Sequence, residues 1–212
     1  MTTRRTVSLS ALGALALGLL VTSPIAAVAQ DAPAALKLTV VRVSIAGTSN
    51  IHPFTASTTD VRMSRLVLAP ADGDRLQAAA KAGGVEAFDI AIRAASLTSP
   101  KEGIDKNMHK ALKVTEHPEI AFRLARLEAG AAANSLKAVG TLKIAGVEKE
   151  VVFAIKTTVN ASTITVVGEV NLVMTDYGIA PPKAMLGMLK TDPKITVTFE
   201  TVFAIPQVTT VH

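Results

Sequence analysis

The histidines of this sequence are its strongest candidates for metal or acid-base chemistry. His52, His109 and His117 stand apart from the terminal His212, and neutral imidazole is a common metal ligand. None of them lies four residues from another, which is the spacing that places two ligands on one face of a helix. His109 also falls on the expected solvent face of a helix. We therefore expect hydrogen-bonding or surface roles for these side chains and no metal site.

Paired carboxylates are the next candidates, because two of them can divide the work of a general acid and a general base. Glu148 and Glu150 share the outer face of an expected strand, and Glu116 and Glu119 flank the His117-Pro118 pair. This spacing favours a solvated or structural role over catalysis.

Motifs for nucleophilic or phosphate chemistry are incomplete. Residues 47–51 (GTSNI) lack the last glycine of a G-x-S-x-G turn. Residues 140–146 (GTLKIAG) continue with Val147-Glu148 and not with the Lys-Ser/Thr of a phosphate-binding loop. We therefore expect a protein that is not an enzyme and that requires no cofactor.

The N-terminal residues resemble an export signal. Two arginines, Arg4 and Arg5, precede the uncharged run 11–21, and residues 27–29 (AVA) form a small-residue cleavage site. The run is shorter than the roughly 18 residues that a membrane-spanning helix needs. We expect a signal peptide over residues 1–29, cleaved after Ala29, and a periplasmic or secreted protein, with the Sec and twin-arginine routes both open.

Composition narrows the class of partner. Without Arg4 and Arg5, 20 of the 22 basic residues remain against 17 acidic ones, a net charge of +3. Single, scattered lysines of this kind do not predict nucleic-acid binding, which needs a clustered basic surface. There is no cysteine, so burial of apolar side chains must hold the exported domain together.

Most of the remaining chain alternates apolar and polar residues with period two, which indicates strands with one buried face. Clear runs cover 88–92, 120–124, 136–144, 151–155, 164–172 and 195–201, and weaker ones cover 37–48 and 54–68. Short turns at 145–147 and 160–162 suit antiparallel hairpins. About eight strands can close into a barrel. We expect a mainly β fold, a single closed antiparallel eight-stranded barrel over residues 37–206, between a tail at 30–36 and a tail at 207–212.

Two segments predict short helices. Ile104, Met108 and Leu112 recur at helical spacing, and the helix must end before Pro118. Residues 74–83 (DRLQAAAKAG) predict a second helix.

The inward positions of the strands combine large apolar residues with small ones such as Ala138, Gly140 and Gly168. Small inward residues favour a cavity for a ligand, although a lumen filled by side chains fits the pattern equally well. The lumen-lining residues that we expect to contact a ligand are Phe88, Ile90, Ile92, Phe122, Leu142, Phe153, Val166, Val170, Val197 and Phe199.

Several segments, taken in order, resemble the YceI family. They are Ser49–Phe54, Ala95–Leu97, Asp105–Leu112, His117–Phe122, Val139–Val151 and Met174–Pro182. The resemblance spans nearly the whole chain after residue 29, although this chain has Pro53-Phe54 after His52 and no tryptophan. It implies a lipocalin-like barrel in the periplasm whose pore holds a polyisoprenoid or another long lipid chain.

The motif residues of this resemblance are expected to be structural. Asp105 caps or anchors the helix, Met108 and Leu112 seat it on the barrel, and Pro118 ends the turn. The full set is His52, Asp105, Met108, Leu112, His117, Pro118, Gly140, Gly146, Asp176, Tyr177 and Gly178.

The leading hypothesis is a non-enzymatic carrier of an isoprenoid lipid such as a quinone. We expect that such a carrier makes transient contact with the membrane or with a membrane redox protein, and that it can form a homodimer. The alternatives are a structural or stress-response module with a filled barrel, and a lipid hydrolase or isomerase if His52, His117 and nearby carboxylates meet in space.

Overall fold

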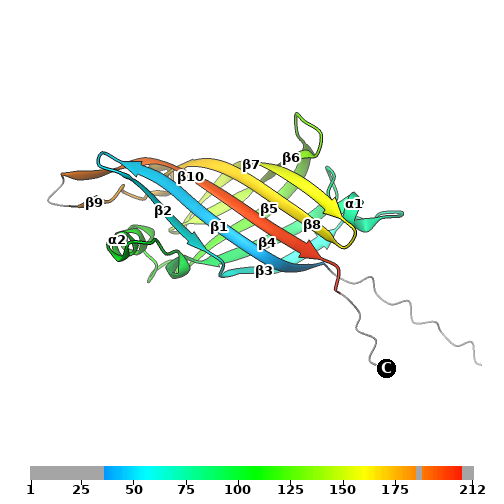
Figure 1. The fold of residues 1–212 in the computed structure, drawn as a ribbon, viewed down its shortest axis with the longest axis horizontal. Coiled ribbons are helices and arrows are strands. Elements are labelled where there is room, and N and C mark those ends of the chain that lie inside the picture. The colour runs from blue at the N-terminus through cyan, green and yellow to red at the C-terminus, as the bar shows by residue number, and fades with distance from the viewer. Residues whose placement is uncertain (1–35, 185–187, 207–212) are drawn as a thin grey trace, which may run out of the picture. The chain divides into compact units, whose positions relative to one another are not determined.

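The computed structural model describes residues 36–184 and 188–206. The expected signal peptide, residues 30–35 of the expected tail and the C-terminal tail at 207–212 lie outside the described residues. The described chain is mainly β, with two short α-helices and two 3-10 turns (Figure 1). In chain order the elements are β1 (Lys37–Ser49), β2 (Pro53–Thr58), β3 (Val61–Leu68), α1 (Arg75–Ala79), β4 (Val85–Arg93), η1 (Ala94–Ser96), α2 (Glu102–Leu112), β5 (Glu119–Ala129), β6 (Ser135–Ile144), β7 (Val147–Asn160), β8 (Thr163–Val173), η2 (Met174–Tyr177), β9 (Lys183–Ala184) and β10 (Leu189–Ala204).

The strands form one curled antiparallel sheet (Figure 1). Its order is β2-β1-β10-β8-β7-β6-β5-β4-β3. Strands β3 to β8 follow one another as a meander, whereas β10 returns to lie between β1 and β8. The first and last long strands of the described chain are therefore neighbours, and every described strand pair is antiparallel, as the turn spacing predicted.

The expected closed barrel of eight strands is not confirmed. The path of the sheet contains nine strands, β9 pairs only with β10, and no ladder joins the terminal strands β2 and β3 within the described residues. The strand is interrupted at Thr59-Asp60, inside the segment that the sequence predicts as one strand over 54–68. The two halves of that segment become strands β2 and β3 at opposite ends of the sheet, which is why the sequence predicts eight strands whereas the path of the sheet contains nine.

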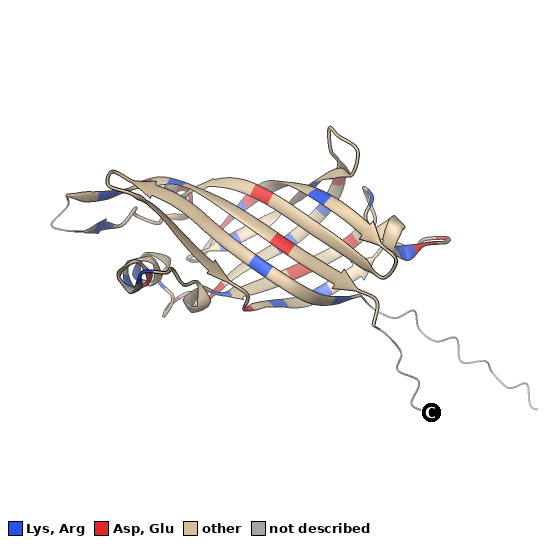
Figure 2. Cartoon of the chain, viewed as in Figure 1, with Lys and Arg blue, Asp and Glu red and all other residues tan. Residues whose placement is uncertain are grey.

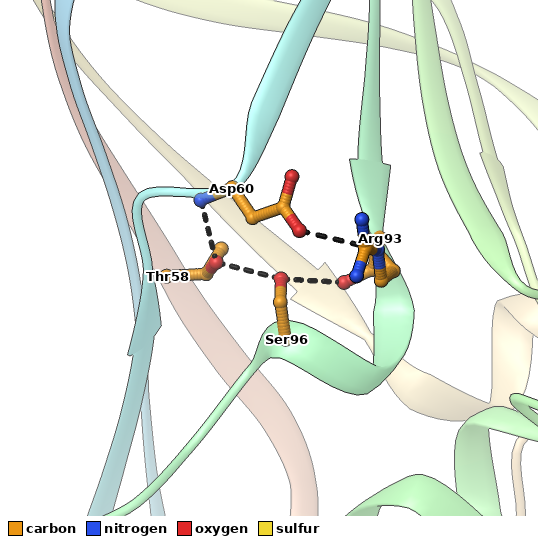
Figure 3. Close-up of polar contacts among 4 residues, drawn as sticks. All are labelled: Thr58, Asp60, Arg93 and Ser96. Atoms are coloured by element: carbon orange, nitrogen blue, oxygen red, sulfur yellow. Dashed lines mark hydrogen bonds and ion pairs between the residues drawn. The ribbon is translucent and has the colours of Figure 1, made fainter.

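Polar contacts link the two ends of the sheet near this break (Figure 3). The Thr58 and Ser96 hydroxyl oxygens are 2.7 Å apart, and Ser96 Oγ donates to the Arg93 carbonyl oxygen at 2.7 Å. Arg93 Nε lies 3.1 Å from Asp60 Oδ2. The backbones of Ser57 and Thr98 also exchange two hydrogen bonds, of 2.8 and 3.1 Å. The end of β2 is thereby tied to the segment that follows β4.

Strand β7 shows how the sequence produces the two faces of the sheet. Val151, Phe153 and Ile155 are buried, whereas Val152 and Lys156, on the opposite face, are exposed. This is the alternation expected of a strand with one buried face. The buried residues of β7 join those of β5, β6 and β8 in the main core inside the curl.

The two helices lie at opposite ends of the sheet (Figure 1). Asp74 begins α1, because its Oδ1 accepts hydrogen bonds from the backbone N–H groups of Leu76 (2.9 Å) and Gln77 (3.2 Å). Helix α1 buries Leu76 and Ala79 in a second apolar cluster with Phe203. Neither helix of the described chain is long and apolar enough to cross a membrane.

Helix α2 is anchored to the loop before it by two side chains. Asp105 Oδ1 accepts from the Ser99 N–H at 2.6 Å, which agrees with its expected anchoring role. His109 Nε2 donates to the Leu97 carbonyl oxygen at 2.7 Å. The expectation that His109 faces solvent is therefore wrong: helix periodicity alone did not reveal that the η1 segment covers this side of the helix. Lys113 ends α2 in the left-handed region, with φ of 53°.

Candidate ligand-binding cavity

The inside of the curled sheet contains a cavity of about 490 Å³. Side chains from both helices and from strands on all sides of the curl line it, and most of them are aliphatic or aromatic. The volume falls within the roughly 300–1,000 Å³ that is usual for small-molecule sites. Between a filled lumen and a lumen with space for a ligand, the structure favours the second.

All of the predicted lumen residues except Val170 line this cavity. Those on its wall are Phe88, Ile90, Ile92, Phe122, Leu142, Phe153, Val166, Val197 and Phe199. Val170 also points inward and is half-buried, but it packs against the core beside a smaller hollow between β7 and β8. The ladder between these strands stops at the Ala154–Glu169 pair, so Val170 lies where the wall divides.

Several lining residues were missed because their strands showed weak alternation. Val41, Val43 and Ile45 of β1 line the cavity, as do Leu66 and Leu68 of β3. In β1 the alternation is confined to a short stretch, where these three residues alternate with Arg42, Ser44 and Ala46. Strand β3 carries the bulges that obscure its period, with register shifts at Met63/Arg65 and at Val67/Leu68.

Phenylalanine rings form a connected row across the cavity wall. The rings of Phe122 and Phe153 meet edge to face with centroids 5.0 Å apart, and those of Phe153 and Phe199 do so at 5.6 Å. A separate pair, Phe88 and Phe203, lies at 5.8 Å. Edge-to-face pairs add about 0.5–1.5 kcal/mol each beyond area burial. The rings of Phe122, Phe153 and Phe199 therefore form one connected aromatic strip in a wall whose other apolar residues are mainly aliphatic.

The inward glycines do not create the space, which corrects one part of the sequence interpretation. A Cβ atom on Gly140 would lie 2.7 Å from Phe122 Cε2, and one on Gly168 would lie 2.7 Å from Phe199 Cε1. Each glycine is therefore covered by an aromatic ring from the neighbouring strand. The glycines allow the rings to lie flat against the sheet, and the cavity is the space that remains inside them.

The cavity has few polar lining groups, and most of them belong to one end. We call this the α2 end; it is bounded by α2, the β1–β2 turn, β9 and the start of β10. Its polar lining residues are Ser49, His52, Lys101, Asn107, Lys183 and Thr191. At the other end, α1 closes the cavity with Ala79 and Ala80. The site is thus polar at one end and apolar along its length, which suits an amphipathic ligand.

The histidines have separate structural partners. His52 Nδ1 lies 3.1 Å from the Pro53 carbonyl oxygen. The His117 ring lies on Gly146, where a Cβ atom would be 2.6 Å from His117 Cε1, and Gly146 has φ of +84°. Among the described residues there is no group of three or more His, Cys, Asp or Glu side chains that could hold a metal ion.

The other motif residues shape the fold around the cavity. Met108 and Leu112 of α2 line it. The Pro118 carbonyl oxygen accepts from the Ala94 N–H at 2.8 Å and so joins the start of β5 to η1. Asp176 lies in η2, and Gly178 ends that turn with φ of +65°.

Tyr177 occupies the place where β7 and β8 separate. Its side chain borders both the main cavity and the smaller hollow between those strands. The residue is 3% exposed, and its hydroxyl has no hydrogen-bond partner among the described residues. Burial raises the pKa of Tyr177 above its ordinary value, and the neighbouring Asp176 carboxylate raises it further.

The fold and the cavity define a class: a β-barrel-like protein with an apolar cavity inside its curled sheet. Residues 36–203 match the model of the YceI-like domain. The chain belongs to the YceI family, as the motifs predicted. Comparison with curated protein sequences gives no match.

Solved structures support the same fold. BcnA of Burkholderia cenocepacia is 15% identical with a TM-score of 0.62, covering 76% of this chain and 95% of its own. A polyisoprenoid-binding domain from Saccharophagus degradans is 13% identical with a TM-score of 0.59, covering 82% of this chain and 99% of its own. A YceI protein of Campylobacter jejuni is 21% identical with a TM-score of 0.51, covering 69% and 84%.

Proposed function

We propose that this protein is a non-enzymatic carrier that holds the hydrocarbon chain of an isoprenoid lipid, such as a quinone, in the cavity of its curled sheet. The observation that carries the proposal is the cavity of about 490 Å³ with an almost wholly apolar wall. The structural likeness to a polyisoprenoid-binding domain supports the ligand class. A periplasmic location rests on the export signal expected over residues 1–29.

The energetics of such binding need no covalent step. Covering about 300 Å² of lipid chain contributes roughly 7.5 kcal/mol at about 25 cal/mol per Å², before the costs of association and ordering. A chain of isoprene units has few polar atoms, so it leaves no unpaired polar group against the apolar wall. A binding protein therefore explains the site better than a filled module or a lipid-modifying enzyme does.

The first test is direct recovery of the ligand. Protein purified from its native host is extracted with organic solvent, and the extract is analysed by mass spectrometry. The expected result is a lipid with an isoprenoid chain at close to one per protein, and saturable binding of an isoprenoid quinone by the delipidated protein. Repeated extracts without lipid, together with no saturation in the titration, would exclude the carrier.

A matched pair of variants locates the binding within the cavity. Val166 lines the cavity, whereas its neighbour Val167 is 40% exposed on the outer face. The chain has no tryptophan, so Val166→Trp and Val167→Trp each introduce one fluorophore. Quinone should quench the tryptophan fluorescence of Val166→Trp, and this variant should bind quinone at least tenfold more weakly than the unmodified protein does. Val167→Trp should keep the affinity of the unmodified protein. Equal affinities in both variants would place the ligand elsewhere.

A further inference from the structure

Two exposed apolar residues, Ile51 and Met188, lie on loops that are hydrogen-bonded to each other at the α2 end of the cavity. Ile51 is 57% exposed and Met188 is 65% exposed, the highest fractions among the large apolar residues of the described chain. Asn50 joins their loops: its Nδ2 donates to the Met188 carbonyl oxygen at 2.8 Å, and its Oδ1 accepts from the Lys190 N–H at 2.7 Å. Single exposed apolar residues are ordinary, but a pair held together in this way is not.

The turn that carries Ile51 is itself held in one conformation. Ser49 Oγ accepts from the N–H groups of Ile51 (3.3 Å) and His52 (3.1 Å), and it donates to the His52 carbonyl oxygen at 2.8 Å. The Asn50 N–H also donates to the Lys190 carbonyl oxygen at 3.1 Å. The Ile51 side chain is therefore presented to solvent by a turn whose backbone is fixed by these hydrogen bonds.

Three lysines, Lys101, Lys183 and Lys190, lie at the same α2 end as this apolar pair. Lys183 and Lys190 are cross-strand partners in the β9–β10 ladder, and both are exposed. Figure 2 shows basic positions on both strands of this ladder. Like charges directly opposite each other on neighbouring strands are destabilising. Neither of them, nor Lys101 beside the cavity, makes an ion pair within the described part of the chain. The exposed carboxylate on this part of β10, Asp192, accepts a hydrogen bond from the Lys194 N–H at 2.8 Å.

We propose that this surface, formed by Ile51, Met188, Lys101, Lys183 and Lys190, docks on an anionic lipid bilayer. Each lysine near such a bilayer contributes about 1 kcal/mol, and apolar side chains add to this by entering the headgroup region. A stable protein partner would need about 800 Å² and some 20–30 residues on each side. Two apolar tips among lysines are too small for that, whereas a bilayer accepts shallow insertion of single side chains.

The docking surface borders the polar end of the cavity, so docking would bring the cavity to the bilayer. Several residues of this surface, or next to it in the chain, also line the cavity. Ser49 and His52 lie within two residues of Ile51, Leu189 follows Met188, and Lys183 is one of the surface lysines. A protein docked by this surface holds the polar end of its cavity against the bilayer, so a lipid chain can pass between them with little exposure to water. The docking itself is independent of what the cavity holds.

The test uses vesicles and one introduced tryptophan. The chain has no tryptophan, so Ile51→Trp introduces a single one. Its emission should shift to the blue with vesicles of 30% phosphatidylglycerol in phosphatidylcholine, but not with vesicles of phosphatidylcholine alone. In co-sedimentation, Ile51→Ser with Met188→Ser should weaken partitioning at least fivefold, and Lys183→Glu with Lys190→Glu at least tenfold. Partitioning should also fall as salt is raised from 50 to 500 mM.

The far end of β1 provides the matched control. Val40 is 51% exposed, and Lys37 is an exposed lysine near it. Val40→Ser with Lys37→Glu removes the same chemistry there and should leave partitioning unchanged. Equal losses in the control and the α2-end variants, no preference for the anionic vesicles, or a loss of self-association in place of vesicle binding would each overturn the proposal. Quinone titration of the same variants in solution reports the cavity separately, so failure of docking and failure of the carrier function give different results.

Discussion

The ring of Phe122 lies on the backbone of Gly140, so that a Cβ atom at Gly140 would be 2.7 Å from Phe122 Cε2 and also close to the Arg123 carbonyl oxygen. The same relationship recurs between Gly168 and Phe199, and between Gly47 and Phe54. In each case a glycine on one strand accommodates an aromatic ring from the next. At these three positions a glycine therefore allows a phenylalanine ring to lie flat against the sheet.

Adding a methyl group to one of these glycines should strain the wall. Gly140→Ala should lower the free energy of unfolding by about 1–3 kcal/mol, because the nearby backbone oxygen cannot move as a flexible side chain could. Gly103, in the first turn of α2, has open space around its Cα. Gly103→Ala should raise stability by up to about 1 kcal/mol. Urea denaturation of both variants measures the difference, and equal effects would contradict it.

Phe153 connects two edge-to-face pairs and is 7% exposed. Phe153→Ala should lower the free energy of unfolding by about 3–5 kcal/mol, since it removes a buried ring and enlarges the cavity. Phe153→Leu should cost less because it keeps most of the apolar volume. Denaturation curves test the order of the two variants. A loss below about 1 kcal/mol for Phe153→Ala would mean that the aromatic row does not stabilise the fold.

The hydroxyl of Tyr177 is buried without a partner, so its removal should not cost stability. Tyr177→Phe should keep or raise the free energy of unfolding by about 1 kcal/mol, because no hydrogen bond is lost and a desolvated polar group disappears. Thermal denaturation of the two proteins checks this. A clear destabilisation would show that the hydroxyl has a partner in solution.

Tyr177 also predicts a dependence of stability on pH. Its pKa in the folded protein is raised above the ordinary value of 10.0, first by burial and then by Asp176. Above pH 10 the unfolded chain loses this proton before the folded protein does, so stability should fall as the pH rises from about 10 toward the higher folded value. Tyr177→Phe should lack this component.

The chain has one tyrosine and no tryptophan, so absorbance at 295 nm follows this group alone. The midpoint of the titration should lie above 10 in the folded protein and return to about 10 in strong denaturant. A midpoint at or below 10 in the folded protein would contradict the raised pKa.

The contacts between the sheet ends offer a further test. Ser96 Oγ contacts both the Thr58 hydroxyl and the Arg93 carbonyl oxygen, at 2.7 Å each. Ser96→Ala should lower the free energy of unfolding by about 1–2 kcal/mol and should speed amide exchange at Ser57 and Thr98. Ser64→Ala is the control, because the Ser64 hydroxyl is exposed and makes one bond of 3.3 Å. Equal effects of the two substitutions would mean that these contacts do not hold the ends of the sheet together.

Short-range patterns in the sequence were enough to predict most of the strands, the helix α2 and nine of the residues that line the cavity. Alternation at Val151, Phe153 and Ile155 reports a buried face wherever those residues lie in space, because neighbouring side chains of a strand always point to opposite faces. The same reasoning places Phe122, Val166 and Phe199 inside the curl. The family motifs then indicated the fold as a whole.

Only the tertiary structure decided which strands became neighbours and what the interior contains. The break at Thr59-Asp60 makes β2 and β3 opposite ends of the sheet, and β10 lies between β1 and β8 through contacts that no local pattern encodes. The contact of His109 with Leu97 and the filling of the space at Gly140 by Phe122 likewise join residues from different elements. Local alternation determines which way a side chain points, but cavity volume depends on how side chains from distant strands meet, and that is a property of the packed molecule.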